Sequence, residues 1–235
     1  MSNLGKKSKI IFVVGTDTGV GKTVLSLILM QFFFAQGDTP FYLKPVQTGC
    51  IDAYDSDSDA AFIYRHVKPL EDRDPAESII YCFKNPKAPF FAAHDEKKAI
   101  DISVIQRTVA EKAEVHTPLI LEGAGGLLVP VTKKACVADL IVLTKARPIV
   151  AARAGLGTIN HTILTIEALK ARGISPLGIV FIDAGEKQTP PEMIEENQSA
   201  IEVVTAVKVA GVISRIDDFA HLPPKCYEPL IKIFG

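Results

Sequence analysis

The sequence predicts an α/β fold in which a doubly wound, mostly parallel sheet carries helices on both faces. Short apolar runs alternate with longer amphipathic stretches along the 235 residues. The apolar runs lack polar alternation, as strands buried between two helix layers do. No repeat, low-complexity tract or composition shift marks a boundary. We therefore expect a single domain over residues 1–235.

The expected elements follow one another in βαβ order. The first strand is the β-branched run at residues 10–14, and a helix follows at residues 21–35. Gly37 is expected to end that helix, because glycine readily adopts the left-handed conformation found there. The other expected strands are residues 41–43, 118–121, 149–152, 177–182 and 207–213. The other expected helices are residues 102–115, 137–145, 158–172 and 191–204. This order predicts right-handed crossovers and a parallel sheet.

Residues 49–101 are the least regular part of the chain and are rich in Asp, Pro and Lys. We expect them to form loops and a short helix. In a doubly wound sheet such connections lie at the carboxyl edge, where ligands bind.

Charge and cysteine content exclude several classes of protein. The net charge of −1 gives no polycationic field, so we expect no nucleic acid and no membrane as partner. The four cysteines show no CxxC or metal-ligand spacing and are expected to be reduced thiols. The apolar run after Lys6, Lys7 and Lys9 is too short for a signal sequence. A cytoplasmic location is expected.

The segment GTDTGVGKT follows the first strand and opens the first helix. Backbone N–H groups at a helix N-terminus, together with the helix dipole, attract phosphate. Lys22 would contact the terminal phosphates, and Thr23 would offer its hydroxyl to Mg²⁺. The strict G-x-x-x-x-G-K-[ST] pattern fails at Thr16, since Gly15 lies six residues before Gly21. The context still predicts a P-loop NTPase-like fold; a glycine turn with a solvated lysine is the alternative.

Lys44 stands at the expected end of the second strand, within KPVQTG. There it would lie beside the phosphate loop and contact both the γ-phosphate and a second anion. Phosphoryl transfer depends on positioning and charge stabilisation, so a second cation is chemically useful. A lysine that merely caps a strand is the alternative.

Acidic residues follow this motif with partial D-x-D-x-D spacing. A calcium-binding EF-hand is excluded: counted from Asp55, positions six and twelve are Ala60 and His66, where Gly and Glu are required. A solvated loop is the default interpretation, although one carboxylate here could hold Mg²⁺.

Glu122 opens the segment EGAGG directly after an expected buried strand. A second metal-binding acid lies at this place in P-loop enzymes. The alternative is an exposed glutamate in a glycine turn.

As a set, GTDTGVGKT, KPVQTG, Ser58-Asp59, EGAGG and LGTINH resemble the dethiobiotin synthetases, and the similarity runs from about residue 9 to residue 182. The resemblance implies a homodimeric P-loop enzyme of biotin synthesis with its substrate site at the interface. Its substrates would be 7,8-diaminononanoate, CO₂ or bicarbonate, and ATP or another NTP with Mg²⁺. A carbamate would form on one amine and accept the γ-phosphate, giving a carbamic–phosphoric anhydride. The second amine would then close the ureido ring.

The resemblance also implies roles for individual positions. Catalytic roles fall on Lys44, Lys22 and Thr18. The nucleotide would contact Gly19, Val20, Gly21, Lys22, Thr23, Val24, Asp59, Glu122, Gly123, Ala124, Gly125, Ile182 and Asp183. The diamine would contact Thr18, Thr48, Gly155, Leu156, Gly157 and Asn160. Mg²⁺ would be held by Thr23, Asp59 and Glu122.

The sequence departs from the family at the expected base site. Many members carry Asn-Asp where this chain has Ile182 and Asp183, and that Asn reads the adenine edge. Many also carry proline where this chain has Ser214. Losing a base-reading amide predicts loosened nucleotide selectivity.

Two other P-loop classes compete with this interpretation. A cobyrinate-type amidoligase usually carries a glutaminase domain, for which this chain has no room. A ParA/MinD-like switch ATPase has a lysine near the start of the loop, where this chain has Asp17 and Thr18. Such a switch would also need a basic patch or an amphipathic tail. The tail has only Lys225 and Lys232, and Pro229 is expected to break any helix there.

Overall fold

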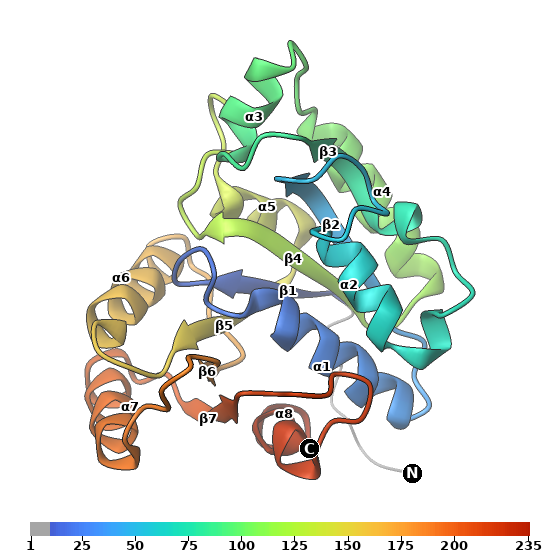
Figure 1. Ribbon diagram of the computed structural model, residues 1–235. Coiled ribbons are helices and arrows are strands. Elements are labelled where there is room, and N and C mark those ends of the chain that lie inside the picture. Colours follow the sequence, from blue (N-terminus) through green and yellow to red (C-terminus); the bar gives the residue numbers. More distant parts are fainter. Residues whose placement is uncertain (1–9) are drawn as a thin grey trace.

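The computed structural model describes residues 10–235, so the predictions on Lys6, Lys7 and Lys9 lie outside the described residues. The centre of the molecule is one seven-stranded sheet (Figure 1). Its strands lie in the order β3 (Ile79–Phe83), β2 (Phe41–Thr48), β4 (Leu119–Gly126), β1 (Ile10–Gly15), β5 (Arg147–Arg153), β6 (Ile179–Asp183) and β7 (Val209–Ser214). All neighbouring strands in it run parallel. The predicted α/β class is confirmed.

Helices cover both faces of the sheet (Figure 1). One face packs against α1 (Lys22–Ala35), α2 (Asp59–His66) and α8 (Glu228–Phe234). The other packs against α3 (Pro89–Asp95), α4 (Ile102–Val115), α5 (Val137–Thr144), α6 (Thr158–Lys170) and α7 (Pro191–Thr205). Short 3₁₀ turns are η1 (Lys68–Leu70), η2 (Pro75–Ser78) and η3 (Pro224–Tyr227). Alternate residues of β1 supply the two apolar layers, as strand geometry requires.

Strand β1 lies between β4 and β5. The chain runs from β1 to β2 and β3 on one side, returns to β4 next to β1, and continues through β5, β6 and β7 on the other side. The order therefore reverses beside β1. Ligands of open α/β sheets bind outside the carboxyl ends of strands at such a reversal. The loops that follow β1, β2 and β4 are consequently the expected walls of a site.

The predicted helices agree with the structure to within two residues at each end. Strands β2 and β4 each continue five residues beyond the predicted end. Strand β2 continues to Thr48 because its second half pairs with β3. Strand β4 continues through the glycines to Gly126, which pairs with Gly15. Glu122 thus lies within a strand and not in a turn.

Two parts of the prediction are wrong. Residues 49–101 contain an edge strand and two helices, where loops and one short helix were expected. The C-terminal segment forms α8, with Pro229 in its first turn. Proline is tolerated there because an N–H in the first turn has no acceptor within the helix. Phe234 of this helix packs against Phe33 of α1, with ring centroids 5.2 Å apart.

Among the helices of residues 10–235, we find none that combines the length and the apolar character needed to cross a membrane.

Candidate functional site

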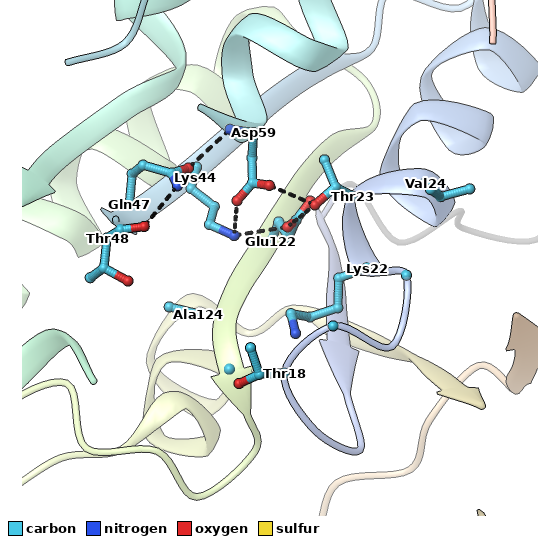
Figure 2. Close-up of a pocket in the computed structure, with 13 residues that line it drawn as sticks. Thr18, Lys22, Thr23, Val24, Lys44, Gln47, Thr48, Asp59, Glu122 and Ala124 are labelled. Carbon is cyan, nitrogen blue, oxygen red and sulfur yellow. Dashed lines mark hydrogen bonds and ion pairs between the residues drawn. The ribbon is translucent and has the colours of Figure 1, made fainter. Parts of the chain in front are cut away.

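A cavity of about 410 Å³ opens at the carboxyl edge of the sheet, beside the ends of β1, β2 and β4 (Figure 2). Its lining residues are Thr18, Gly19, Gly21, Lys22, Thr23, Val24, Lys44, Gln47, Thr48, Asp59, Glu122, Ala124 and Gly125. The structure therefore brings together most residues expected from the phosphate loop, KPVQTG and EGAGG. Gln47 is the lining residue that the sequence analysis did not single out.

The phosphate loop leads from β1 into α1. Gly21 has φ +88°, and a Cβ there would lie 2.6 Å from Cγ2 of Ile182, so only glycine fits. The Lys22 side chain is buried, and its Nζ donates to the carbonyl of Asp17 at 3.0 Å. Burial, followed by the nearby charge of Lys44, lowers the pKa of Lys22 to about 8. The N-terminus of α1 and this ammonium thus face the same cavity.

Three hard oxygen donors converge beside Lys22. The Thr23 hydroxyl lies 2.7 Å from Asp59 Oδ1 and 3.0 Å from Glu122 Oε1 (Figure 2). Adjacent ligands of an octahedral Mg²⁺ are about 3 Å apart, given bond lengths near 2.1 Å. In the described part of the chain, no three His, Cys, Asp or Glu side chains form a metal cluster. Two carboxylates and a hydroxyl fit Mg²⁺, which commonly completes its shell with water and substrate phosphate.

Lys44 lies between the two carboxylates. Its buried Nζ is 2.6 Å from Asp59 Oδ2 and 2.8 Å from Glu122 Oε1, and it also donates to the carbonyl of Gly123 at 3.4 Å. Burial alone would lower the pKa of Lys44, but Asp59 and Glu122 outweigh that effect and raise it. Burial would raise the pKa of Asp59, but Lys44 and Thr23 hold it below its usual range. Lys44 and Asp59 are therefore both charged.

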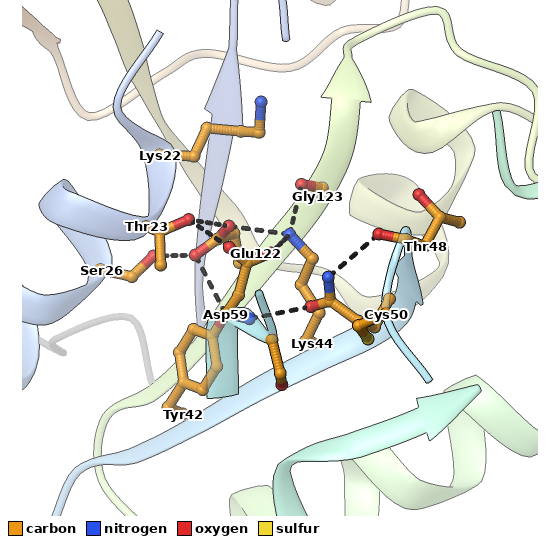
Figure 3. Close-up of polar contacts among 12 residues, drawn as sticks. Lys22, Thr23, Ser26, Tyr42, Lys44, Thr48, Cys50, Asp59, Glu122 and Gly123 are labelled. Carbon is orange, nitrogen blue, oxygen red and sulfur yellow. Dashed lines mark hydrogen bonds and ion pairs between the residues drawn. The ribbon is translucent and has the colours of Figure 1, made fainter. Parts of the chain in front are cut away.

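Glu122 has two further donors. The buried hydroxyls of Ser26 and Tyr42 donate to its Oε2 at 2.8 and 3.1 Å (Figure 3). Burial, and then the charge of Glu122, raise the pKa of Tyr42, so its hydroxyl keeps its proton. Gln47 holds the other acidic residue, Asp59, in place: the Gln47 Oε1 accepts a hydrogen bond from the backbone N–H of Asp59 at 3.3 Å.

The segment at residues 155–160 lies outside this cavity. Leu156 and Gly157 line a small separate hollow together with Val20. The Asn160 side chain is exposed. The backbone carbonyl of Ala154 accepts a hydrogen bond at 2.8 Å from the buried side-chain amide of Asn197 on α7. The proposed contact of this segment with the diamine remains a prediction.

Ile182 and Asp183 do not line the cavity either. Ile182 is only 5% exposed and packs on Gly21 of the phosphate loop. The Asp183 carboxylate accepts from the backbone N–H of Thr189 at 3.0 Å and from its hydroxyl at 2.9 Å. Their predicted contacts with a nucleotide base remain predictions.

The four cysteines of the chain are free. Two of them meet just beyond the carboxyl end of β2, where Cys50 Sγ lies 3.2 Å from Cys82 Sγ on β3. Burial raises the pKa of both thiols.

The fold and the phosphate loop together define a P-loop nucleotide-binding protein. A family profile described as "AAA domain" matches residues 9–221. Among solved structures, the chain is similar to the MinD cell division protein of Aquifex aeolicus, with TM-score 0.56, 16% identity and 95% and 94% of the two chains covered. The cell division ATPase MinD of Pyrococcus furiosus gives TM-score 0.54 at 16% identity, with 97% of each chain covered. Identities this low support the fold alone.

Proteins related to the chain in sequence identify its family. The chain is 42% identical over 174 residues to the ATP-dependent dethiobiotin synthetase BioD of Hydrogenobaculum sp., covering 73% of this chain and 76% of the relative. It is 36% identical over 212 residues to the BioD protein of Methanococcus vannielii, covering 89% and 95%. The chain belongs to the dethiobiotin synthetase family.

Proposed function

We propose that this protein is an ATP-dependent, C–N bond-forming dethiobiotin synthetase that acts in the cytoplasm as one P-loop catalytic domain. Its substrates would be 7,8-diaminononanoate, CO₂ and ATP, with Mg²⁺. The observation that carries this proposal is the convergence of Lys22 and Lys44 with Thr23, Asp59 and Glu122 in one cavity. Family membership supplies the reaction.

The phosphate loop would bind the nucleotide through its backbone N–H groups and Lys22. Thr23, Asp59 and Glu122 would hold Mg²⁺ through the oxygens described above. When bound, the ion neutralises charge on the transferring phosphoryl group. The buried setting strengthens each of these electrostatic interactions.

Lys44 would stabilise the reacting groups. It lies across the cavity from the phosphate loop, on the strand next to Glu122. Its ammonium would contact both the carbamate and the γ-phosphate while the phosphoryl group passes between them. Charge stabilisation by fixed groups is commonly the largest contribution to such a step.

Thr18 and Thr48 would bind the amine end of the diamine. Both line the 410 Å³ cavity and also an adjoining cavity of about 300 Å³ bounded by residues 86–89. A substrate held by the two hydroxyls would therefore have one end at Lys44 and its chain in the adjoining space.

A homodimer would complete the site. Leu128, Leu156 and Leu164 are 58%, 92% and 60% exposed, and Leu128 and Leu164 line one hollow near the phosphate loop. Exposed apolar groups of this kind are typical of interfaces. The N-terminus of α6, near residues 155–160, would bind the distant carboxylate of the diamine held by the other subunit. Light scattering should give the mass of a dimer, and Leu164→Glu should shift it toward the monomer.

Product analysis tests the reaction. The protein is incubated with the diamine, ATP, Mg²⁺ and isotopically labelled bicarbonate, and mass spectrometry follows labelled dethiobiotin. ADP release should require both the diamine and bicarbonate. A ParA/MinD-like switch, the alternative function, would hydrolyse ATP without either of them. ATP hydrolysis that ignores the diamine, with no labelled product, would overturn the proposal.

A further inference from the structure

The two oxygens of Glu122 have different surroundings (Figure 3). Oε1 accepts hydrogen bonds from Thr23 at 3.0 Å and from Lys44 at 2.8 Å, two residues that line the cavity. Oε2 accepts from Ser26 at 2.8 Å and from Tyr42 at 3.1 Å. The mechanism above uses neither Ser26 nor Tyr42.

The backbone explains how both hydroxyls reach Oε2. Ser26 follows Thr23 by three residues on α1, so the two side chains share a helix face. Tyr42 precedes Lys44 by two residues on β2, so these side chains share a sheet face. Glu122 lies on β4, the neighbour of β2. Ser26 and Tyr42 are 0% and 1% exposed, so bulk water does not compete with their hydroxyls for Oε2.

We infer that Ser26 and Tyr42 determine which divalent cation the site accepts. The Thr23 hydroxyl can turn its proton away from Oε1 when its own oxygen binds a metal ion, whereas Oε2 stays engaged by two buried hydroxyls, so Glu122 offers the ion Oε1 alone. Mg²⁺ takes one oxygen from each carboxylate in a strict octahedron, whereas Ca²⁺ has a larger shell that often takes both. The pair therefore favours Mg²⁺ and disfavours Ca²⁺. Both residues act through Glu122 and are positioning residues. This inference rests on the proposed function, since it assumes a metal–nucleotide complex in the cavity.

The test uses Tyr42→Phe, Ser26→Ala and the double variant. Tyr42→Phe removes one oxygen and keeps the ring, so packing is preserved. The control is Tyr227→Phe, because the Tyr227 hydroxyl donates to Gln31 Oε1 at 2.9 Å and not to Glu122. Calorimetry measures binding of a non-hydrolysable ATP analogue with Mg²⁺, Mn²⁺ or Ca²⁺, so the readout does not depend on turnover.

The wild-type protein and the control should bind the Mg²⁺ complex more tightly than the Ca²⁺ complex. In the double variant the ratio of the two affinities should fall about tenfold or more, because hydrogen bonds to a charged acceptor are the stronger ones. The single variants should give smaller falls. A general loss of packing would weaken both complexes alike and leave the ratio unchanged.

An unchanged ratio in folded Tyr42→Phe and Ser26→Ala proteins would overturn the inference, as would a wild-type protein that forms dethiobiotin but binds both complexes equally. A wild-type protein that makes no dethiobiotin in the product assay overturns the proposed function instead.

Discussion

Replacing Lys44 by methionine removes a buried charge and keeps most of the side-chain volume. Its Nζ lies 2.6 Å from Asp59 and 2.8 Å from Glu122, so the variant leaves two carboxylates near each other without the ammonium that contacts both. Removing one partner of a buried ion pair costs about 3–5 kcal/mol. The Asp59 side chain is 25% exposed, so we expect a free-energy cost at the lower end of this range. At about 3 kcal/mol, the melting temperature should fall by roughly 6–12 °C.

The same variant should lose turnover. If Lys44 stabilises the transferring phosphoryl group, kcat should fall by about 10²–10³. The KM for ATP should stay within a few-fold, because Lys22 and the phosphate loop remain. Added Mg²⁺ should recover part of the lost melting temperature, since the ion neutralises the same carboxylates. Steady-state phosphate release and thermal unfolding with and without Mg²⁺ measure these effects.

Lys208→Met is the matched control. Lys208 is paired with Glu202 at 2.8 Å, but its side chain is 85% exposed, so the change should have little effect on stability. A Lys44→Met protein with near wild-type kcat would show that Lys44 only neutralises the carboxylates. An unchanged melting temperature would refute the buried ion pair.

Three further outcomes are expected. Glu122→Gln should raise the Mg²⁺ concentration needed for half-maximal turnover, since a neutral amide binds hard cations poorly; an unchanged titration would place Glu122 outside the metal shell. The raised pKa values of Cys50 and Cys82 leave little thiolate near neutral pH. Their alkylation by iodoacetamide, followed by mass spectrometry, should be slow at pH 7 and accelerate as the pH rises; rapid labelling at pH 7 would contradict this. Finally, ATP, CTP, GTP and UTP should support turnover with kcat/KM values within about tenfold, roughly 1.4 kcal/mol.

Three main groups of the cavity were predictable from the sequence because each is tied to a local signal. Lys22 and Thr23 begin a helix after a glycine turn, and Glu122 follows an apolar strand. Parallel strands bring these positions to one edge of the sheet. Asp59 was reached only through the family resemblance, since acidic spacing alone gave several candidates.

The supporting residues had no such signal. Tyr42 lies in an apolar run and Ser26 in an apolar helix, so each resembles an ordinary core position. Their common partner is Glu122, which is 80 and 96 positions away along the chain. Only the packing of α1 and β2 around β4 brings the three together. Strand β3 was missed although its sequence IIYCF is rich in β-branched and aromatic residues, which favour a strand.

The predicted loss of base selectivity rests on Ile182 and Asp183. The side chain at this position packs on Gly21, where a Cβ would meet it at 2.6 Å, so it supports the phosphate loop. The neighbouring Asp183 is already bonded twice to Thr189. Neither side chain is left to read a base edge, and a site without a polar group to satisfy rejects analogues weakly. Ile182→Asn should therefore raise the preference for ATP, because it restores an amide at the position where many family members read the adenine edge. A preference for ATP of about a thousandfold in the wild-type protein, roughly 4 kcal/mol, would refute this argument and indicate that backbone groups read the base.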